Sequence, residues 1–336
     1  MLSICIPTFN RKARLDDCLN SILISSKKIK FNLEVCISDN NSDYDIAKLI
    51  SKYQSSLNIK FNKNKTNIGF AANAIKVVSM AKGEFSWLIG DDDLLVPDSL
   101  LYMEILFQKN PDVDYFYVNS YHLESDKILS FPKPLDTNLV DLKKLKSISN
   151  YKENKKVMFW DVIDPNVSWD FLIGIFVSIF RTKSWMKQIE KLNKKQVSDR
   201  ETWSTFENTC LHPVLLCEAF KNSTAYICSK PLSINLIGAR EWGDLYEFIE
   251  IVRIPQLLDY YRSKGLPLKK YLYCKNFALR NFSSYMFKIF IKGKKKGWTY
   301  INLKKDILSN LFFPNVYLSF FRFFFKKFLK LIGLKY

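Results

Sequence analysis

The strongest constraint on the fold is a regular alternation of short apolar runs and amphipathic segments over the first 120 residues. Short apolar runs bounded by polar turns are typical of buried strands, whereas apolar residues three or four apart are typical of helices. Strands that alternate with helices predict a mostly parallel sheet flanked by helices, and so an α/β fold. The expected strands are 2–7, 33–38, 57–61, 84–90 and 114–121, and the expected helices are 11–25, 43–54, a helix carrying residues 74–81, and one starting at 97–98.

The remaining chain divides less clearly. Residues 122–170 show no clear pattern, 171–181 and 224–237 look like strands, and 206–221 looks like a helix. From residue 245 onward the pattern is helical. We therefore divide the chain into an α/β part over 1–120, a less regular part over 121–244 and a helical extension over 245–336.

Three successive aspartates, Asp91, Asp92 and Asp93, follow the expected strand 84–90. Alternation along a strand would turn Asp91 and Asp93 to the same side, where their charges repel unless a cation lies between them. Carboxylate oxygens suit Mg²⁺ or Mn²⁺, which also bind the oxygens of a diphosphate. The alternative is a solvated acidic turn, but ligands of such sheets bind at the carboxyl ends of strands, which favours a metal site.

Three other segments lie where strands meet helices. IPTFNR (6–11) offers Pro7, Thr8, Asn10 and Arg11, with Asn10 as a plausible N-cap, and ISDNNS (37–42) places Asp39 after the second strand. NIGFAANAIK (67–76) contains Asn67, Gly69, Asn73 and Lys76. Glycine permits close approach of backbone to a ligand, and an acid after a strand can bind a base or ribose. The alternatives are ordinary turns and a capped helix with a solvent-facing lysine.

These segments, in this order and spacing and together with IGDDDLL, resemble the family-two glycosyltransferases of GT-A fold over about residues 1–110. A weaker likeness to the abequosyltransferase-like branch continues through VSIFRTKSW (177–185) and PLSINLIGAREW (231–242). The resemblance implies that Pro7, Thr8 and Asp39 hold the nucleotide of a nucleotide-diphosphate sugar. It also implies that Asp91 and Asp93 bracket a divalent cation and the diphosphate, with Asp93 ahead as the direct ligand.

The acidic pair that often supplies the base in this family has no clean copy here. The candidates are Asp199, Glu201, Glu207 and His212, with Glu207 ahead of Asp199 and His212, and for each the alternative is surface charge or helix capping. The Q-x-x-R-W motif of processive synthases is absent from the sequence, which favours transfer of a single sugar to a glycan or lipid-linked acceptor. The resemblance implies inversion at the anomeric carbon and a role in bacterial surface polysaccharide synthesis.

Two other functions compete with this interpretation. A sugar nucleotidyltransferase also uses paired acids and a metal, but its first loop is expected to be rich in glycine, and residues 7–14 contain none. A nucleic-acid-binding protein would use the basic C-terminal region, in which aromatic residues are interspersed. That function leaves the acidic cluster unexplained, so we expect no nucleic-acid partner.

The net charge of +18 is concentrated near the C-terminus, where residues 262–336 hold eighteen Lys and Arg and one acid, Asp306. Within 311–334, the residues Asn315, Ser319, Arg322, Lys326 and Lys330 form one helical stripe, and aromatic residues cover the rest. We expect this helix to lie on an anionic membrane surface, with packing on the catalytic domain or formation of a homo-oligomer as alternatives. The seven cysteines are scattered, which is typical of free thiols in a reducing compartment. The sequence shows no signal peptide and no apolar run long enough to span a membrane. We therefore expect a peripheral protein on the cytoplasmic face of the cell membrane.

Overall fold

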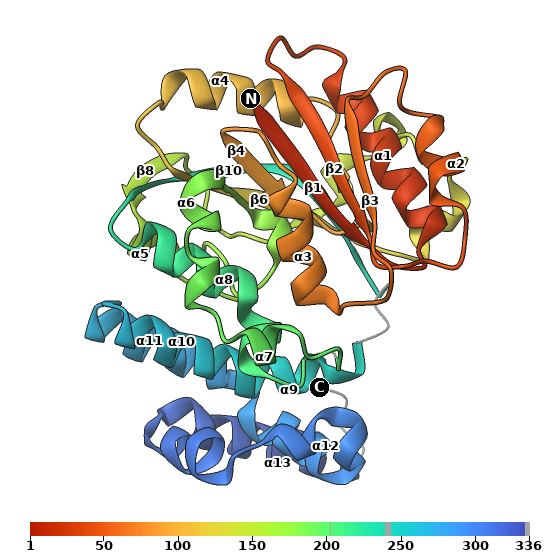
Figure 1. Ribbon diagram of the computed structural model, residues 1–336. Helices are drawn as coiled ribbons and strands as arrows, with labels where there is room; N and C mark the ends of the chain where they lie inside the picture. Colours follow the sequence, from red (N-terminus) through yellow and green to blue (C-terminus); the bar gives the residue numbers. More distant parts are fainter. Residues whose placement is uncertain (202, 239–242, 333–336) are drawn as a thin grey trace.

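The structure is a computed structural model that describes residues 1–201, 203–238 and 243–332, without the side chains of 295–296 and 330–331. The end of the segment 231–242 noted above therefore lies outside the described residues. Figure 1 shows a twisted sheet with helices on both sides and a stack of further helices below it, which ends in the blue C-terminal helices.

In the described part of the chain, ten strands form a single sheet. The strands are β1 Leu2–Thr8, β2 Leu33–Asp39, β3 Ile59–Lys63, β4 Phe85–Leu88, β5 Asp93–Leu95, β6 Tyr115–Glu124, β7 Lys146–Ser147, β8 Lys155–Met158, β9 Ser178–Arg181 and β10 Thr224–Ile237. The main order is β3-β2-β1-β4-β9-β6-β10-β5, while β7 pairs with β6 and β8 pairs with β10.

The α-helices of the described residues connect the strands and then form the C-terminal stack. They are α1 Lys12–Ser26, α2 Ile46–Ser51, α3 Phe70–Ser79, α4 Ser99–Lys109, α5 Phe159–Val162, α6 Thr182–Met186, α7 Lys194–Val197, α8 Phe206–Phe220, α9 Tyr246–Phe248, α10 Ile254–Ser263, α11 Leu268–Ala278, α12 Phe282–Lys292 and α13 Pro314–Leu331. The predicted elements of the first 120 residues are all present, with their ends displaced by a few residues.

The strand order creates the position of the site. The chain steps outward from β1 to β2 to β3 and then returns across the sheet to β4, which lies on the other side of β1. Because parallel crossovers are right-handed, α1 and α2 cover one face and α3 covers the other. The carboxyl ends of β1 and β4 are therefore neighbours at the point where the strand order reverses, which is where such sheets bind ligands.

Beyond β4 the sheet becomes mixed. β9 runs antiparallel to both β4 and β6, β6 and β10 are parallel, and β5 pairs antiparallel with β10. The predicted parallel character thus holds for the first four strands in space. The predicted strand 171–181 is wrong in its first half, since Phe171 and Leu172 have positive φ angles of 53° and 75° and only Ser178–Arg181 is a strand.

The region after residue 245 is helical, as predicted, and builds outward from the catalytic core. α10 packs against α8 and α11, whereas α12 and α13 pack on each other and form the outermost layer in Figure 1. A separate apolar cluster joins this layer to the core through residues such as Phe248, Ile251, Phe282, Phe313 and Val316. None of the helices in the described residues has the length and apolar character needed to cross a membrane. All seven cysteines are buried free thiols.

Candidate active site

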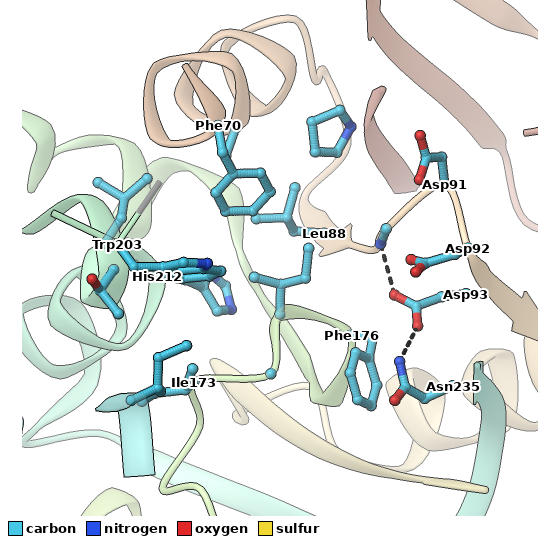
Figure 2. A pocket seen from close by; sticks show the side chains of 18 of the residues that line it. Phe70, Leu88, Asp91, Asp92, Asp93, Ile173, Phe176, Trp203, His212 and Asn235 are labelled. Carbon is cyan, nitrogen blue, oxygen red and sulfur yellow. Dashed lines mark hydrogen bonds between the residues drawn. The ribbon is translucent and has the colours of Figure 1, made fainter. Parts of the chain in front are cut away.

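A cavity of about 300 Å³ opens at the carboxyl ends of β1 and β4. One wall is formed by the loop after β1, the turn 90–93 and the N-terminal half of α3, and the other by segments around 169–177, 200–212 and 246–254. Figure 2 shows the three aspartates and Asn235 on one side of this cavity and Trp203 and His212 on the other. We call the side with the aspartates the acidic wall and the side with Trp203 and His212 the aromatic wall.

Asp91, Asp92 and Asp93 all line the cavity and are nearly buried. Strand alternation is the wrong reason for this arrangement, because β4 ends at Leu88, Asp91 and Asp92 lie in the turn, and Asp93 begins β5. A tight turn between two buried strands instead brings all three carboxylates to one wall.

Asp91 is held from the side of β1. Thr8 Oγ1 donates a hydrogen bond of 2.7 Å to Asp91 Oδ2, and Arg11 Nη1 lies 3.3 Å from Asp91 Oδ1 and 3.5 Å from Asp92 Oδ2. Burial and then the neighbouring Asp92 carboxylate raise the pKa of Asp91 to about 7, although Arg11 and Thr8 act against this shift. The cluster therefore carries more negative charge than its own partners neutralise.

Asp93 is held by the backbone of the turn and by a side chain of β10. Its Oδ2 accepts a hydrogen bond of 2.7 Å from the Gly90 N–H, and its Oδ1 accepts one of 2.8 Å from Asn235 Nδ2. Gly90 leaves the space that the carboxylates occupy, since a Cβ there would lie 2.6 Å from Asp92 Oδ1 and 3.1 Å from Asp93 Oδ2. Only glycine fits at this position without displacing both side chains.

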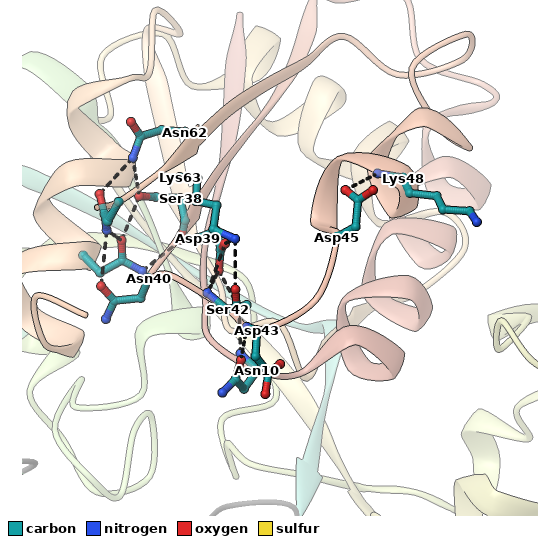
Figure 3. A network of polar contacts seen from close by, with 12 residues as sticks. Asn10, Ser38, Asp39, Asn40, Ser42, Asp43, Asp45, Lys48, Asn62 and Lys63 are labelled. Carbon is teal, nitrogen blue, oxygen red and sulfur yellow. Dashed lines mark hydrogen bonds and ion pairs between the residues drawn. The ribbon is translucent and has the colours of Figure 1, made fainter. Parts of the chain in front are cut away.

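A polar network continues the acidic wall toward α3 (Figure 3). Asn73 Nδ2 donates to the Ser38 carbonyl, and Asn73 Oδ1 accepts from Ser38 Oγ and from Asn64 Nδ2. Asn40 Nδ2 donates to Asn67 Oδ1 at 2.7 Å. Asn40, Asn67 and Asn73 all line the cavity. The network fixes their amide groups at the cavity wall.

Gly69 lines the same part of the cavity and has a φ of 84°, a conformation that favours glycine. A Cβ there would lie 3.3 Å from the Asp199 carbonyl oxygen, so Gly69 also permits close approach of the loop 199–201. Lys76, predicted to face the nucleotide, is exposed on α3 and is not among the residues that line the cavity.

Asp39 and Asn10 are also not among the residues that line the cavity. Asp39 is fully buried, and its carboxylate accepts hydrogen bonds from the backbone N–H and the hydroxyl of Ser42, with Lys63 Nζ at 3.9 Å (Figure 3). The predicted N-cap role of Asn10 is wrong, because α1 is preceded by Arg11 and no side chain caps it. Asn10 has a φ of 54° and instead accepts a hydrogen bond from the Asp43 N–H. Asp39 and Asn10 thus shape the loops that carry Pro7, Thr8 and Arg11 into the cavity.

Glu207, Asp199 and Glu201, three of the four base candidates, do not face the cavity. Glu207 accepts a hydrogen bond from the Asn193 N–H, and Asp199 accepts from the Glu201 N–H and from Ser204 Oγ. Neither side chain is among those that line the cavity, and the same is true of Glu201. The structure therefore gives Glu207 and Asp199 local structural partners instead of a position facing the cavity.

His212 does line the cavity. It is 3% exposed, packs near Phe180 and Trp185, and has no hydrogen-bond partner for either ring nitrogen among the described residues. Burial lowers the pKa of His212 to about 3, so the imidazole is neutral at pH 7. A neutral, unpartnered imidazole at a cavity wall can exchange hydrogen bonds with a bound ligand.

Sequence reasoning missed several cavity residues because they come from distant or irregular segments. Asn235 reaches Asp93 only through the pairing of β10 with β5. Asp170 lies in the irregular loop before β9, where its carboxylate accepts hydrogen bonds from Ser168 Oγ and the Gly174 N–H. Other missed lining residues include His122, Trp169, Tyr246 and Glu250. Only the polar Asn235 in the apolar strand SINLI gave a local signal.

A family model described as "Glycosyl transferase family 2" matches residues 3–165, which contain the whole acidic wall except Asn235. Over 115 residues, the chain is 36% identical to abequosyltransferase RfbV of Salmonella typhimurium, covering 34% of each chain. Over 117 residues, it is 27% identical to an uncharacterized glycosyltransferase of Haemophilus influenzae, covering 35% of this chain and 38% of that protein. The similar segment thus spans about a third of the length of these two relatives.

The fold has a counterpart among solved structures. The crystal structure of Staphylococcus aureus TarS 1–349 in complex with UDP superposes with a TM-score of 0.55 at 14% identity, over 90% of this chain and 76% of that one. At this level of identity the likeness establishes the shared GT-A fold. Together with the family match over residues 3–165, it agrees with the fold and the resemblance derived from the sequence: this part of the chain is similar to the family 2 glycosyltransferases, an abequosyltransferase among them.

Proposed function

We propose that this protein transfers one sugar from a nucleotide-diphosphate sugar to a hydroxyl group of a glycan or lipid-linked acceptor. The observation that carries the proposal is the acidic wall, where Thr8, Arg11 and three buried aspartates meet beside the asparagine network. Its donors and acceptors suit a ribose and a diphosphate bound with a cation. In this proposal, residues 1–120 bind the donor and residues 121–244 bind the acceptor.

A divalent cation, Mn²⁺ or Mg²⁺, fits the residues of the acidic wall. The raised pKa of Asp91 reflects clustered, desolvated carboxylates, and a cation would relieve their repulsion. The described residues hold no group of three or more His, Cys, Asp or Glu side chains placed to form a metal cage. Asp93 and Asp91 would therefore hold the ion together with donor phosphate oxygens. When bound, such an ion neutralises charge on the leaving diphosphate.

The chain's own residues would orient the donor and remove the acceptor proton. Asn235 and the Gly90 N–H keep the Asp93 carboxylate in place, and Thr8 and Arg11 do the same for Asp91. Of the four base candidates from the sequence, His212 is the one that lines the cavity, and its low pKa makes it a weak base. Asp170 also lines the cavity and is a carboxylate. We therefore place Asp170 ahead of His212 as the base, with Glu207 and Asp199 behind both because neither lines the cavity.

Proton removal from the acceptor, followed by in-line attack at the anomeric carbon, would invert its configuration. The bond that forms joins the acceptor oxygen to the anomeric carbon, and the bond that breaks releases the nucleoside diphosphate. The relative named as an abequosyltransferase supports a role in bacterial surface polysaccharide synthesis. We further propose that the basic C-terminal region holds the enzyme on the cytoplasmic face of the cell membrane, where a lipid-linked acceptor would be presented.

The direct test is a panel of UDP-, GDP-, CDP- and dTDP-linked sugars incubated with the full chain and Mn²⁺, with release of the nucleoside diphosphate as the readout. We expect hydrolysis of one donor class by the wild type and loss of that hydrolysis in Asp93→Asn. Hydrolysis of none of the donors, together with pyrophosphate release from a nucleoside triphosphate and a sugar phosphate, would favour the nucleotidyltransferase alternative. Salt-dependent RNA binding without any donor hydrolysis would favour the nucleic-acid alternative.

A further inference from the structure

The polar stripe of α13, predicted from the sequence, faces the protein. The Asn315 N–H donates to Asn276 Oδ1, and Asn315 Nδ2 donates to the Asn276 carbonyl at 2.7 Å. Ser319 is 3% exposed and accepts a hydrogen bond from the Ser283 N–H. Arg322 Nη2 donates to the Arg280 carbonyl. These three residues of α13 form a polar seam with α11, α12 and the short turn Leu279–Asn281 between them. The side chain of Lys330 lies outside the described residues.

The opposite side of α13 is aromatic and faces solvent. At 100° per residue, its exposed apolar side chains fall within an arc of about 160°. Each of them is at least 49% exposed: Tyr317, Leu318, Phe320, Phe321, Phe324, Phe325 and Phe328. Exposed rings of this number are unusual, because soluble monomers rarely expose a large contiguous apolar patch.

Neighbouring elements also expose apolar side chains. Phe290 and Ile291 of α12 are each 65% exposed, and Phe312, just before α13, is 89% exposed. Phe287 of α12 packs at 5.2 Å from Phe323 of α13, measured between ring centroids, so the two helices form one unit. We call the exposed apolar residues of α12, Phe312 and α13 the aromatic face.

Charge identifies what covers this face. The same part of the chain exposes lysines on several elements, including Lys292, Lys304, Lys305 and Lys327. Asp306, the one acid in 262–336, is 2% exposed and binds Gln256 and the Asn302 N–H. A second copy of the chain would therefore bring two strongly positive surfaces together, whereas an anionic bilayer supplies the opposite charge.

We propose that the aromatic face enters the boundary between the headgroups and acyl chains of an anionic bilayer, while the polar seam keeps α13 attached to the enzyme. The proposal rests on the membrane-surface function above and assigns the residues that make the contact. α13 has 18 residues and lies across the outermost layer, so the rings enter the bilayer side-on.

The seam also makes the attachment rigid. Phe313 and Val316 are buried in the apolar cluster that contains Phe248 and Ile249. Ile249 and the adjacent Glu250 line the cavity, and Glu250 is bound by Arg280 at 3.1 Å and by Asn281 at 2.9 Å. The helices that carry the aromatic face therefore contact the elements that line the aromatic wall. This arrangement would hold the cavity at a fixed orientation to a lipid-linked acceptor.

The test is co-sedimentation of the full chain with vesicles of phosphatidylcholine and phosphatidylglycerol in a 70:30 ratio, at low salt and in 0.5 M NaCl. We expect wild-type binding to survive high salt in part, because burial of aromatic rings is not screened as surface charge is. The double variant Phe321→Ser/Phe325→Ser should lose roughly tenfold or more in partitioning. Leu129→Ser/Leu139→Ser is the matched control, since both leucines are exposed on the catalytic domain.

Two results would overturn the proposal. One is a stable dimer in light scattering that binds no vesicles and becomes monomeric in Phe321→Ser/Phe325→Ser, which would assign the face to a second copy. The other is binding that vanishes in 0.5 M NaCl and is unchanged by the serine variants, which would leave only surface electrostatics. Donor hydrolysis is measured in parallel without vesicles. If hydrolysis persists while vesicle binding is absent, only the membrane proposal fails, whereas absence of hydrolysis counts against the proposed transfer activity.

Discussion

The two walls of the cavity are built in different ways. The acidic wall comes from strand ends and the turn between β4 and β5, and nearly every polar group that the structure places there has a defined partner. The aromatic wall comes from irregular segments and from helices of the second half of the chain. Its buried His212 has no hydrogen-bond partner among the described residues.

This difference indicates a division of labour between the walls. A preorganised polar surface suits a charged group that is the same in every donor, which in the proposed function is a diphosphate with its cation. An apolar surface with few polar groups suits recognition of a particular sugar or acceptor, where shape decides specificity. The four predictions below probe the walls in order of the expected effect.

The largest effect should follow from Asp93→Asn. The change removes a charge from the acidic wall but keeps a side chain that fits between Gly90 and Asn235. We expect turnover to fall by roughly 10²–10³-fold with the melting temperature nearly unchanged, because the substitution acts on charge stabilisation. Asp98→Asn, at an exposed ion pair with Lys28, is the matched control and should keep wild-type turnover. Full turnover of the wild type in excess EDTA would contradict the role of a cation.

Asn235→Ala should have a smaller effect on the same wall. It removes the hydrogen bond of 2.8 Å to Asp93 Oδ1 without removing a charge. Groups that orient metal ligands change metal affinity by roughly 10–100-fold, so the Mn²⁺ concentration for half-maximal activity and the Mn²⁺ affinity in calorimetry should both shift in that range. A merely structural role predicts a lower melting temperature with an unchanged Mn²⁺ affinity. Asn138→Ala, in an exposed turn, is the control.

His212 of the aromatic wall should make the stability of the protein depend on pH. The pKa of His212 is about 3 in the folded chain and about 6.5 when unfolded, so the unfolded state binds the extra proton between these values. Stability should therefore fall as the pH decreases from 6.5, by roughly 2 kcal/mol at pH 5. His212→Leu should abolish this part of the acid sensitivity in urea unfolding, whereas His122→Leu should retain it. An unchanged pH dependence in His212→Leu would show that the imidazole is not the group responsible.

The smallest effect should follow from Lys76→Ala. The sequence predicted that Lys76 faces the nucleotide, but the structure places it exposed on α3 and away from the cavity lining. Surface charges at such positions contribute little, so the donor KM should change by less than about twofold. A tenfold rise in donor KM at unchanged kcat would instead restore the original prediction.

The acidic wall was largely predictable because its residues lie at the ends of strands that periodicity reveals. Thr8 and Asp91 could be assigned from strand order, since the carboxyl ends of parallel strands share one edge. Asn73 was assigned instead from its place on the helix that follows Gly69. Asn235 could not, because its contact with Asp93 depends on the antiparallel pairing of β10 with β5, which no local pattern encodes.

The aromatic wall and the C-terminal layer were less predictable for a different reason. The loop that carries Asp170 leads into Phe171 and Leu172, whose positive φ angles break the strand that their apolar character predicts. In α13, helical periodicity identifies a polar stripe but not the direction in which it faces. Burial of Ser319 and the bond from Asn315 to Asn276 show that it faces the protein.

The division of labour between the walls can be measured by hydrogen–deuterium exchange with Mn²⁺ present, comparing UDP, GDP, CDP and dTDP with the matching sugar nucleotides. We predict that the bound nucleoside diphosphate slows exchange at 6–11, 38–42, 67–76 and 90–93, and that the intact donor additionally slows exchange at 169–177 and 203–212. Slowed exchange at the acidic wall should disappear in Asp93→Asn. Protection by the bare nucleoside diphosphate that is centred on 169–177 and 203–212, with none at 90–93, would contradict the assignment of the diphosphate to the acidic wall.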